Sequence, residues 1–406
     1  MMTSYDNSKI DDKHLPVIIS AKRSAIGRAN GMFKNVSAEV LLSTVLKNVV
    51  SSAKIDASDI DDVIVGNAAG GGGNIARLAA LMAGFDLHVP GLTVDRQCGG
   101  GLEAINLACR MVMSGAGDIY VAGGVESVST APKRARQSSA SSGELEFYDR
   151  ARFSPDNIGD PDMGVAAENV ARTYSISRER QDAFALQSHQ RAVQSQRSEI
   201  FADEIVPTML GDQLFNLDEC PRDDTNLQKL AVLPAKFVSS GTVTAGNSCP
   251  LNDGAALVVI TSLAKAKDLG IEKAIAFVDG ATRGVDPNHL GIGPIASTTY
   301  LFDRQRNICV KDLQFIEFNE AFASQVLASL DGLGIEAERV NLDGGALALG
   351  HPFGASGAIL VVRLFAQMLK DQNFRDKAIS LATLGTAGGM GVSTLFKSLK
   401  VNSCSN

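Results

Sequence analysis

The chain has 406 residues, of which 45% are hydrophobic and 20% charged, with 39 glycines and no tryptophan. A length of this order corresponds to about two to three domain equivalents. The composition predicts a folded protein with a large core of small side chains. The formal net charge of −7 disfavours nucleic acid as the main partner, because phosphate binding requires a basic face.

The six cysteines stand at positions 98, 109, 220, 249, 309 and 404, with no CxxC pair and no histidine at ligand spacing. This pattern predicts no metal site and no disulfide framework, and it fits reduced thiols in the cytoplasm. Residues 1–14 are polar, and we expect a frayed tail there rather than a targeting peptide. No apolar run is long enough to cross a bilayer. We therefore expect a soluble, cytoplasmic protein without membrane insertion.

The first part of the chain alternates short apolar runs with amphipathic periodicity. Strands are predicted over 15–20, 61–68 and 118–124, and helices over 37–53 and 101–115. In the second helix, one face carries Leu102, Ile105, Cys109 and Val112. A β–α–β–α rhythm of this kind indicates a mostly parallel sheet that is covered on both faces.

From about residue 130 to 236 the character of the sequence changes. Polar, loop-like segments surround one helical pattern over 178–196, and strand signals are scarce. We interpret this stretch as an excursion from the first domain that could cover an active site. The strand–helix rhythm then resumes, over 253–268, 274–283, 313–323, 344–369 and 377–396. Each half has a glycine-rich elbow before a helix, followed by an apolar strand ending in glycines, which suggests an internal duplication.

Cys98 stands in the first elbow, VDRQCGGGLEAI, on a predicted strand-to-helix turn where three glycines permit a sharp bend. A thiol at a helix N-terminus meets unpaired N–H groups and the positive end of the helix dipole, which lower its pKa. The same N–H groups can stabilise a thioester oxyanion. The alternative is a buried, small hydrophobic residue, which is what most cysteines are.

His351 stands in the second elbow, LGHPFGASGA, at a turn that opens a helix rich in glycine and alanine. Histidine is the usual partner that takes a proton from a catalytic thiol. The alternative is a structural histidine in a turn. Because one elbow carries the cysteine and the other the histidine, we pair Cys98 as nucleophile with His351 as base.

Asn319 and Glu320 follow the apolar strand FIEF and precede a helix. Open α/β sheets place their ligands at the carboxyl ends of strands, so Asn319 is a candidate site residue. It could also cap the helix that follows. The glycine-rich segment GNAAGGGGN lacks both GxGxxG and GxxxxGK[ST], so a nucleotide-binding loop is disfavoured.

With these residues in place, the chain from about residue 15 onward resembles the thiolase family. The resemblance lies in RQCGGGLEAI, VAGGVESVS, MGVAAENVA, RQDAFALQSHQRA, GTVTAGN, NDGAA, GIGP, NEAFA, GGALALGHPFGASGA and GGMG. It implies an α/β fold of five αβαβα layers with two duplicated halves and an inserted loop domain. The expected parts are a tail (1–14), an N-terminal half (15–129 and 237–270), the inserted loop domain (130–236) and a C-terminal half (271–400).

The resemblance also implies roles for particular residues. Cys98 would be acylated after His351 takes its proton, and His351 with a water held by Asn319 would form one oxyanion hole. The backbone N–H groups of Cys98 and Ala387 would form the second. Substrate and coenzyme A would be bound at the positions that match the family's pantetheine pocket, which are Met163, Phe237, Ala245, Cys249 and Phe322. Coenzyme A and acyl-CoA thioesters are then substrates, no further cofactor is needed, and a homodimer or homotetramer is expected.

The chain departs from the family pattern at the catalytic positions. The C-terminal loop reads ATLGTAGGMG, so Gly385 replaces the second cysteine, which serves as acid and base toward the substrate carbon. The family's GNASG is GNSCP here, which brings in Cys249, and NxNGG has become NLDGG, with Asp343 for an amide. We hypothesise from the first two changes that Cys249 partly takes over the missing role.

Three functions follow from this pattern. The first is a thiolase-type acyltransferase that cleaves 3-ketoacyl-CoA with CoA or condenses acyl-CoA units, slowed by Gly385. The second is a decarboxylative condensing enzyme that uses a malonyl-type thioester, since loss of CO2 generates the carbanion without a base. The third is a poorly active subunit that binds acyl-CoA.

Overall fold

The first half of the chain builds five strands and three helices around a common core. They are β1 (Pro16–Arg23), β2 (Gly27–Arg28), α1 (Ala38–Ala53), β3 (Asp62–Gly66), α2 (Ile75–Met82), β4 (Leu92–Val94), α3 (Gly100–Ser114) and β5 (Ile119–Ser127). The computed structural model describes residues 10–138, 143–370 and 372–401. Residues 1–9 of the expected tail, residues 139–142 of the polar loop, and Cys404 lie outside these ranges.

The elements after the excursion repeat this pattern. They are β10 (Asn252–Ser262), α7 (Leu263–Asp268), β11 (Lys273–Gly284), α8 (Gly293–Arg304), β12 (Leu313–Phe318), α9 (Ala323–Leu333), α10 (Ala346–Leu349), α11 (Phe353–Leu369), β13 (Ile379–Thr386) and β14 (Met390–Lys400). Short 3-10 turns lie at Ala57–Asp59, Pro287–Ile292, Val310–Asp312 and Ala337–Arg339. The predicted strands and helices of both halves are therefore present, with ends shifted by a few residues.

These strands form one ten-stranded sheet in the order β12-β13-β14-β11-β1-β10-β5-β3-β4, with β2 paired to β10. The expectation of a mostly parallel sheet is wrong. Only β3–β4, β3–β5 and β12–β13 are parallel, whereas β1–β10, β5–β10, β11–β14 and β13–β14 are antiparallel. The reason is connectivity: strands joined through a helix run parallel, but β14 follows β13 through a tight turn. Gly388 and Gly389 make that turn with φ of +80° and +73°.

The pairing supports a duplicated architecture. In the first half β3 pairs parallel with β5, which pairs antiparallel with β10, and β10 with β1. In the second half β12, β13, β14 and β11 follow the same sequence of parallel, antiparallel and antiparallel pairs. Helix α3 precedes β5 as α11 precedes β13. Cys98 and His351, which lie just before these two helices, therefore occupy matching places in the two halves.

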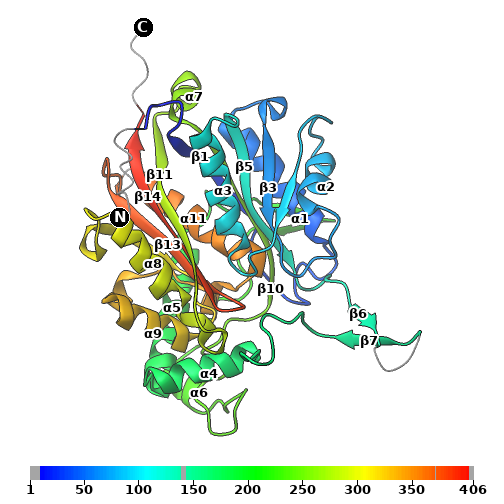
Figure 1. Ribbon diagram of the computed structural model, residues 1–406, viewed down its shortest axis with the longest axis vertical. Coiled ribbons are helices and arrows are strands. Elements are labelled where there is room, and N and C mark those ends of the chain that lie inside the picture. The colour runs from blue at the N-terminus through cyan, green and yellow to red at the C-terminus, as the bar shows by residue number, and fades with distance from the viewer. Residues whose placement is uncertain (1–9, 139–142, 371, 402–406) are drawn as a thin grey trace.

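Helices form the layers around the strands (Figure 1). Helices α3 and α11 pack on each other and contact strands of both halves of the chain. They therefore form a middle layer between the strands of the first half and those of the second half. Helix α1 packs on β1, β5 and β10 and against α2, while α8 packs on β11, β13 and β14 and against α9. The predicted face of α3 is confirmed, because Leu102, Ile105, Cys109 and Val112 are all 0% exposed.

The excursion between β5 and β10 contains α4 (Met163–Thr173), α5 (Arg178–Arg197) and α6 (Leu227–Ala231). The helix expected over 178–196 is α5. Two small hairpins, β6 (Arg134–Gln137) with β7 (Leu145–Tyr148) and β8 (Thr208–Leu210) with β9 (Gln213–Phe215), were not expected from the sequence. Their strands are three or four residues long and mostly exposed, so they leave little hydrophobic pattern. The β6–β7 hairpin projects from the body of the molecule (Figure 1).

Candidate active site

Cys98 lies in a tight elbow between β4 and α3. The sequence predicted that glycines make this bend, but the residue with left-handed backbone is Gln97, at φ +51°. Asp95 stabilises that conformation, because its Oδ1 accepts hydrogen bonds from the Gln97 backbone N at 2.8 Å and from Nε2 at 3.0 Å. Gly99 is needed for space instead: a Cβ there would lie 2.8 Å from Cγ2 of Thr386. The elbow that carries Cys98 thus packs tightly against the end of β13.

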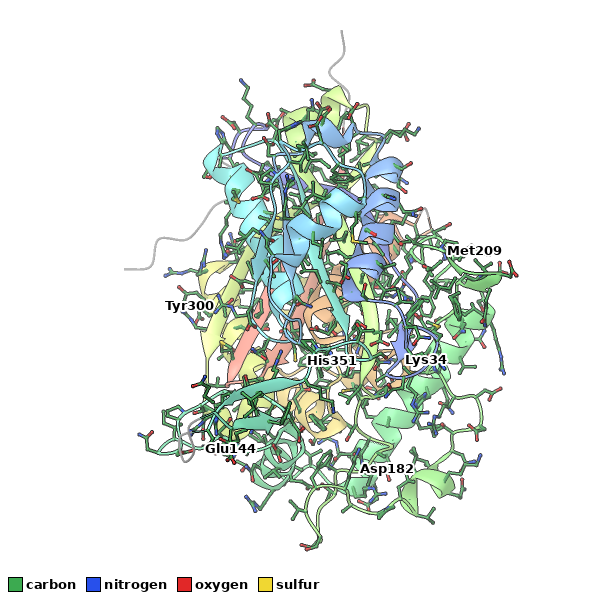
Figure 2. All side chains as sticks on the ribbon, turned by 90° about the vertical axis from the view of Figure 1, so that its right-hand side faces the viewer. Lys34, Glu144, Asp182, Met209, Tyr300 and His351 are labelled. Atoms are coloured by element: carbon green, nitrogen blue, oxygen red, sulfur yellow. The ribbon has the colours of Figure 1, made fainter. Side chains whose placement is uncertain are left out.

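His351 lies in the matching elbow between α10 and α11, inside the molecule (Figure 2). Its backbone N donates to Oδ1 of Asn252 at 2.9 Å, and its Nδ1 lies 2.6 Å from Oγ of Ser356. Burial lowers the pKa of His351 to about 4, so the imidazole is neutral at pH 7 and can accept a proton. Because Ser356 engages Nδ1, the nitrogen that would meet a thiol or a substrate is Nε2.

The two elbows are brought together by close packing of α3 on α11. A Cβ on Gly101 would lie 2.6 Å from the carbonyl oxygen of Gly354, so the helices approach here without side chains between them. The buried carboxylate of Glu126 binds the same region, accepting from the N–H of Gly354 at 3.1 Å and of Ala68 at 3.0 Å. This places the N-termini of both helices at one point of the middle layer.

The thiol of Cys98 differs from the sequence-based prediction. Burial raises its pKa to about 12, and the charges of Glu126 and Asp95 add to this shift. Hydrogen bonding from the backbone N–H groups of Ala387 and of Cys98 itself acts in the opposite direction. The expected lowering of the pKa is therefore wrong for the resting protein, because desolvation outweighs the helix N-terminus. The two N–H groups predicted to bind an oxyanion do interact with the sulfur.

Asn319 follows β12, where its backbone N donates to the carbonyl of Thr383 at 3.1 Å. It does not cap the next helix, because the N-cap of α9 is Phe322. Its side chain is 2% exposed, and among the described residues its Nδ2 has no hydrogen-bond partner. A buried amide in this state is suited to hold a water or a substrate oxygen.

Gly385 lies near the end of β13, two residues before Ala387. A Cβ built on it would lie 3.1 Å from the carbonyl oxygen of Gly291. The position is therefore two residues from the Ala387 N–H that meets the sulfur of Cys98, and it carries no group that could exchange a proton.

A cavity of about 590 Å³ lies beside these residues, between the excursion and the segment before β10. Of the predicted binding residues, Ala245 and Cys249 line it. Burial raises the pKa of Cys249, and the charge of Cys98 adds to the shift, so the two thiols lie within electrostatic reach of each other. The cavity thus extends from the neighbourhood of the thiol to the surface of the excursion.

The other three predicted binding residues, Met163, Phe237 and Phe322, lie close to one another and near Cys249. The rings of Phe237 and Phe322 pack edge to face with centroids 6.1 Å apart. Residue 322 also bridges to Ser248, the neighbour of Cys249. Met163 begins α4, and a Cβ on the adjacent Gly164 would lie 2.2 Å from the Phe237 ring. The structure therefore brings together positions that are up to 159 residues apart in sequence.

Four basic residues that sequence reasoning did not assign also line the cavity: Arg28, Arg222, Lys229 and Lys236. Arg28 belongs to a basic segment of the sequence, KRSAIGR (22–28). A second basic segment, KRAR (133–136), lies instead at the β6–β7 hairpin, where Arg136 pairs with Glu146 at 3.0 Å. The others stand singly among polar residues, so no local pattern marks them. Within the described ranges there is no cluster of His, Cys, Asp and Glu that could hold a metal.

A duplicated, layered α/β fold with a thiol and an imidazole at matching elbows is the arrangement of thiolase-type acyltransferases. Comparison with known proteins agrees. The family models for the thiolase N-terminal and C-terminal domains match residues 16–264 and 272–398. The chain belongs to the thiolase family.

Two relatives are VraB proteins, each provisionally named an acetyl-CoA C-acetyltransferase. The protein from Staphylococcus epidermidis is 46% identical over 384 residues, which cover 94% of this chain and 98% of the relative. The protein from Staphylococcus aureus is 44% identical over 387 residues, with the same coverage. The solved structure of the Bacillus anthracis acetyl-CoA acetyltransferase matches with a TM-score of 0.90 and 36% identity, over 95% of this chain and 99% of that one. In the part of the chain that the structure describes, no helix has the length and apolar character needed to span a membrane.

Proposed function

We propose that this protein transfers acyl groups between coenzyme A thioesters through an acyl thioester on Cys98. The observation that carries the proposal is the pairing of two elbows in the middle layer, one with a thiol whose sulfur meets two backbone N–H groups and one with a neutral, buried imidazole. A nucleophile, a base and an oxyanion site are what acyl transfer requires.

In the proposed acylation step, Nε2 of His351 takes the proton of Cys98 as the sulfur attacks the thioester carbon. Since the resting thiol has a raised pKa, proton loss accompanies the attack rather than preceding it. The N–H groups of Cys98 and Ala387 then stabilise the oxyanion. His351 and a water held by Nδ2 of Asn319 would stabilise the enolate oxygen of the second substrate.

The substrate class is supported by the cavity. Its basic residues suit the phosphate groups of coenzyme A, and Arg222 is suited to bidentate contact. The pantetheine arm would then run past Ala245 and Cys249 toward Cys98, with Phe237, Phe322 and Met163 beside it. The proposed chemistry uses CoA and acyl-CoA as substrates and needs no other cofactor.

Gly385 favours a second candidate for the carbon–carbon step. Cleavage of a 3-ketoacyl-CoA or condensation of two acyl-CoA units requires a proton exchange at the substrate carbon, and glycine offers none. Decarboxylative condensation with a malonyl-type thioester would avoid this requirement, because loss of CO2 leaves the carbanion. We therefore expect ordinary thiolysis to be slow unless another group supplies the proton.

Intact-protein mass spectrometry after incubation with acetyl-CoA tests the proposal. The expected result is one acetyl adduct that is absent in Cys98→Ala and strongly reduced in His351→Ala. Absence of the adduct in the wild-type protein would instead support an acyl-CoA-binding subunit. Comparing turnover of acetoacetyl-CoA plus CoA with that of malonyl-CoA plus acetyl-CoA then separates the two enzymatic candidates.

We also propose a homodimer or homotetramer. Strand β4 ends the sheet, so within the described ranges no strand pairs with its outer edge. Exposed apolar side chains gather on β4, on α2 and between them, at Leu78, Leu81, Met82, Leu87 and Leu92, with Leu87 78% exposed. Pairing of two β4 edges would cover this surface. Because Cys98 follows β4 by four residues, such an interface would also adjoin the active site.

A further inference from the structure

A second, small cavity lies on the Nδ1 side of His351. Its volume is about 20 Å³, which is room for one water molecule. Four polar side chains line it: Glu317 of β12, Asn319 after that strand, and Ser356 and Arg363 of α11. Glu317 and Ser356 are each 3% exposed, and none of the residues that line this cavity lines the cavity proposed for coenzyme A.

The lining of the cavity is suited to a bound water. The Nδ2 of Asn319 and the Nε of Arg363 are buried, and within the described ranges neither has a hydrogen-bond partner. Both residues border the cavity. Ser356 connects it to the active site, because its Oγ lies 2.6 Å from Nδ1 of His351. One water would therefore complete a chain of polar atoms from Glu317 to the catalytic imidazole.

Glu317 faces other charged groups from every side. Nε2 of Gln367 donates to Oε1 of Glu317 at 2.9 Å and to Oδ2 of Asp343 at 2.8 Å. The Arg363 guanidinium pairs with Asp343 and with Glu204. The pKa of Glu317 is raised to about 8, mainly by burial; the charges of Asp343 and Glu204 contribute to the rise, and Arg363 and Gln367 oppose it. Glu317 can therefore both take up and release a proton close to neutral pH.

On the far side of this network, the positive charge of Arg23 is already paired with carboxyl groups. Arg23 of β1 pairs with Glu204 at 2.7 Å and with Asp218 at 2.7 Å, and both partners are almost fully buried. Four carboxyl groups therefore share two guanidinium groups, so one protonated carboxyl group lowers the repulsion among them.

We propose that Glu317 is a positioning residue that stores the proton for the carbon–carbon step of the proposed reaction. As Nε2 of His351 takes the thiol proton of Cys98, the Nδ1–H bond breaks and that proton passes through the Ser356 hydroxyl and the cavity water to the ionised Glu317, where an O–H bond forms. When cleavage leaves the carbanion, the Nε2–H bond breaks and a C–H bond forms on the carbanion. The O–H bond of Glu317 then breaks, and its proton returns along the same path to Nδ1.

This route connects two departures from the family pattern. Gly385 removes a proton donor from one side of the substrate, and Asp343 adds a carboxylate beside Glu317 where the family has an amide. The added charge helps Glu317 to keep its proton. We favour this route over Cys249, because Cys249 lines the cavity where the pantetheine arm would lie.

The inference rests on the proposed function, so two rates are measured on the full chain with acetyl-CoA. One is acetylation of Cys98, followed by rapid quench and mass spectrometry. The other is exchange of the acetyl methyl protons in D2O, followed by NMR between pH 6 and pH 10. Removal of a methyl proton requires the ionised carboxylate of Glu317 as the final acceptor. The wild-type exchange rate should therefore rise as the pH passes 8.

In Glu317→Gln, exchange should fall at least tenfold more than acetylation, and the rise near pH 8 should disappear. Ser356→Ala should show the same selective loss, and it tests the route even if the first variant does not fold. Asp343→Asn should move the rise to lower pH, since it removes a neighbouring negative charge. Asp279→Asn is the matched control: this carboxylate is also buried, but on β11 beside Arg304 and Gln305, and both rates should stay within twofold.

The proposal is overturned if Glu317→Gln and Ser356→Ala both exchange methyl protons at the wild-type rate and with the wild-type pH profile. Loss of exchange in Cys249→Ser alone would do the same, and so would a wild-type protein that acetylates Cys98 without exchanging methyl protons. A wild-type protein without the Cys98 adduct would refute the proposed function itself, which is a different result.

Discussion

Restoring a thiol at position 385 is the most direct test of the site. Gly385→Cys places a Cβ 3.1 Å from the carbonyl oxygen, 3.3 Å from the Cα and 3.4 Å from the carbonyl carbon of Gly291. These contacts are tight by a few tenths of an ångström, so we expect a stability loss near the lower end of the overpacking range, about 1 kcal/mol. The variant should therefore fold, with a slightly lower melting temperature.

The expected gain is in the carbon–carbon step. A positioned general acid contributes roughly 10²–10⁴-fold to such a step. Since the restored thiol must share its space with Gly291, we expect about a tenfold to hundredfold increase in the rate at which acetoacetyl-CoA is cleaved by CoA. Acetylation of Cys98 by acetyl-CoA should change little, because that step uses His351.

Gly385→Ala is the matched control, since it adds the same Cβ without a thiol. Both variants are assayed at equal concentration after thermal melts show that they are folded. If Gly385→Cys and Gly385→Ala cleave acetoacetyl-CoA at the same rate while Cys98 still acetylates, a missing acid at position 385 does not limit this enzyme.

Four further outcomes are expected. Alkylation of Cys98 by iodoacetamide in the free protein should be slow at pH 7, and its rate should rise about tenfold per pH unit up to pH 10, because burial raises the pKa of the thiol to about 12. A rate that reaches a plateau near pH 7 would contradict this expectation. Arg222→Ala should raise KM for acetoacetyl-CoA by about tenfold, from loss of a charge-assisted contact, but not KM for an N-acetylcysteamine thioester, which lacks the phosphates. Leu87→Glu should reduce the oligomer mass in sedimentation velocity at low micromolar concentration, whereas an unchanged mass would place the interface elsewhere. Thiolysis by Cys249→Ser should stay within about threefold of wild type, and a loss of tenfold or more would instead support Cys249 as the replacement acid.

Local patterns predicted many individual elements. The helix over 37–53 is α1, the helix over 101–115 is α3, and the apolar face of α3 is buried. These predictions succeed because helical and strand periodicities are set by which face of a segment meets the core. Sheet direction was predicted wrongly, because whether β13 and β14 run parallel depends on a turn of three residues rather than on the strands themselves.

The candidate site, like the fold, was predicted from local sequence patterns only in part. Sequence alone predicted the pairing of Cys98 with His351, because each stands in a glycine-rich elbow and is a residue type with few other uses there. It missed Arg222 and the other cations of the open cavity, which are scattered along the chain and converge only in the folded protein. It also missed the route through Ser356 to Glu317, since that depends on a cavity shared by β12 and α11.

The sequence by itself determined the family and the absence of a cysteine at position 385, and it predicted Cys98 as nucleophile and His351 as base, because these rest on chemical identities that no packing can alter. Only the tertiary structure decided the protonation states. Burial raises the pKa of Cys98, lowers that of His351 and raises that of Glu317. Desolvation depends on everything that surrounds a group, and those surroundings come from segments hundreds of residues apart.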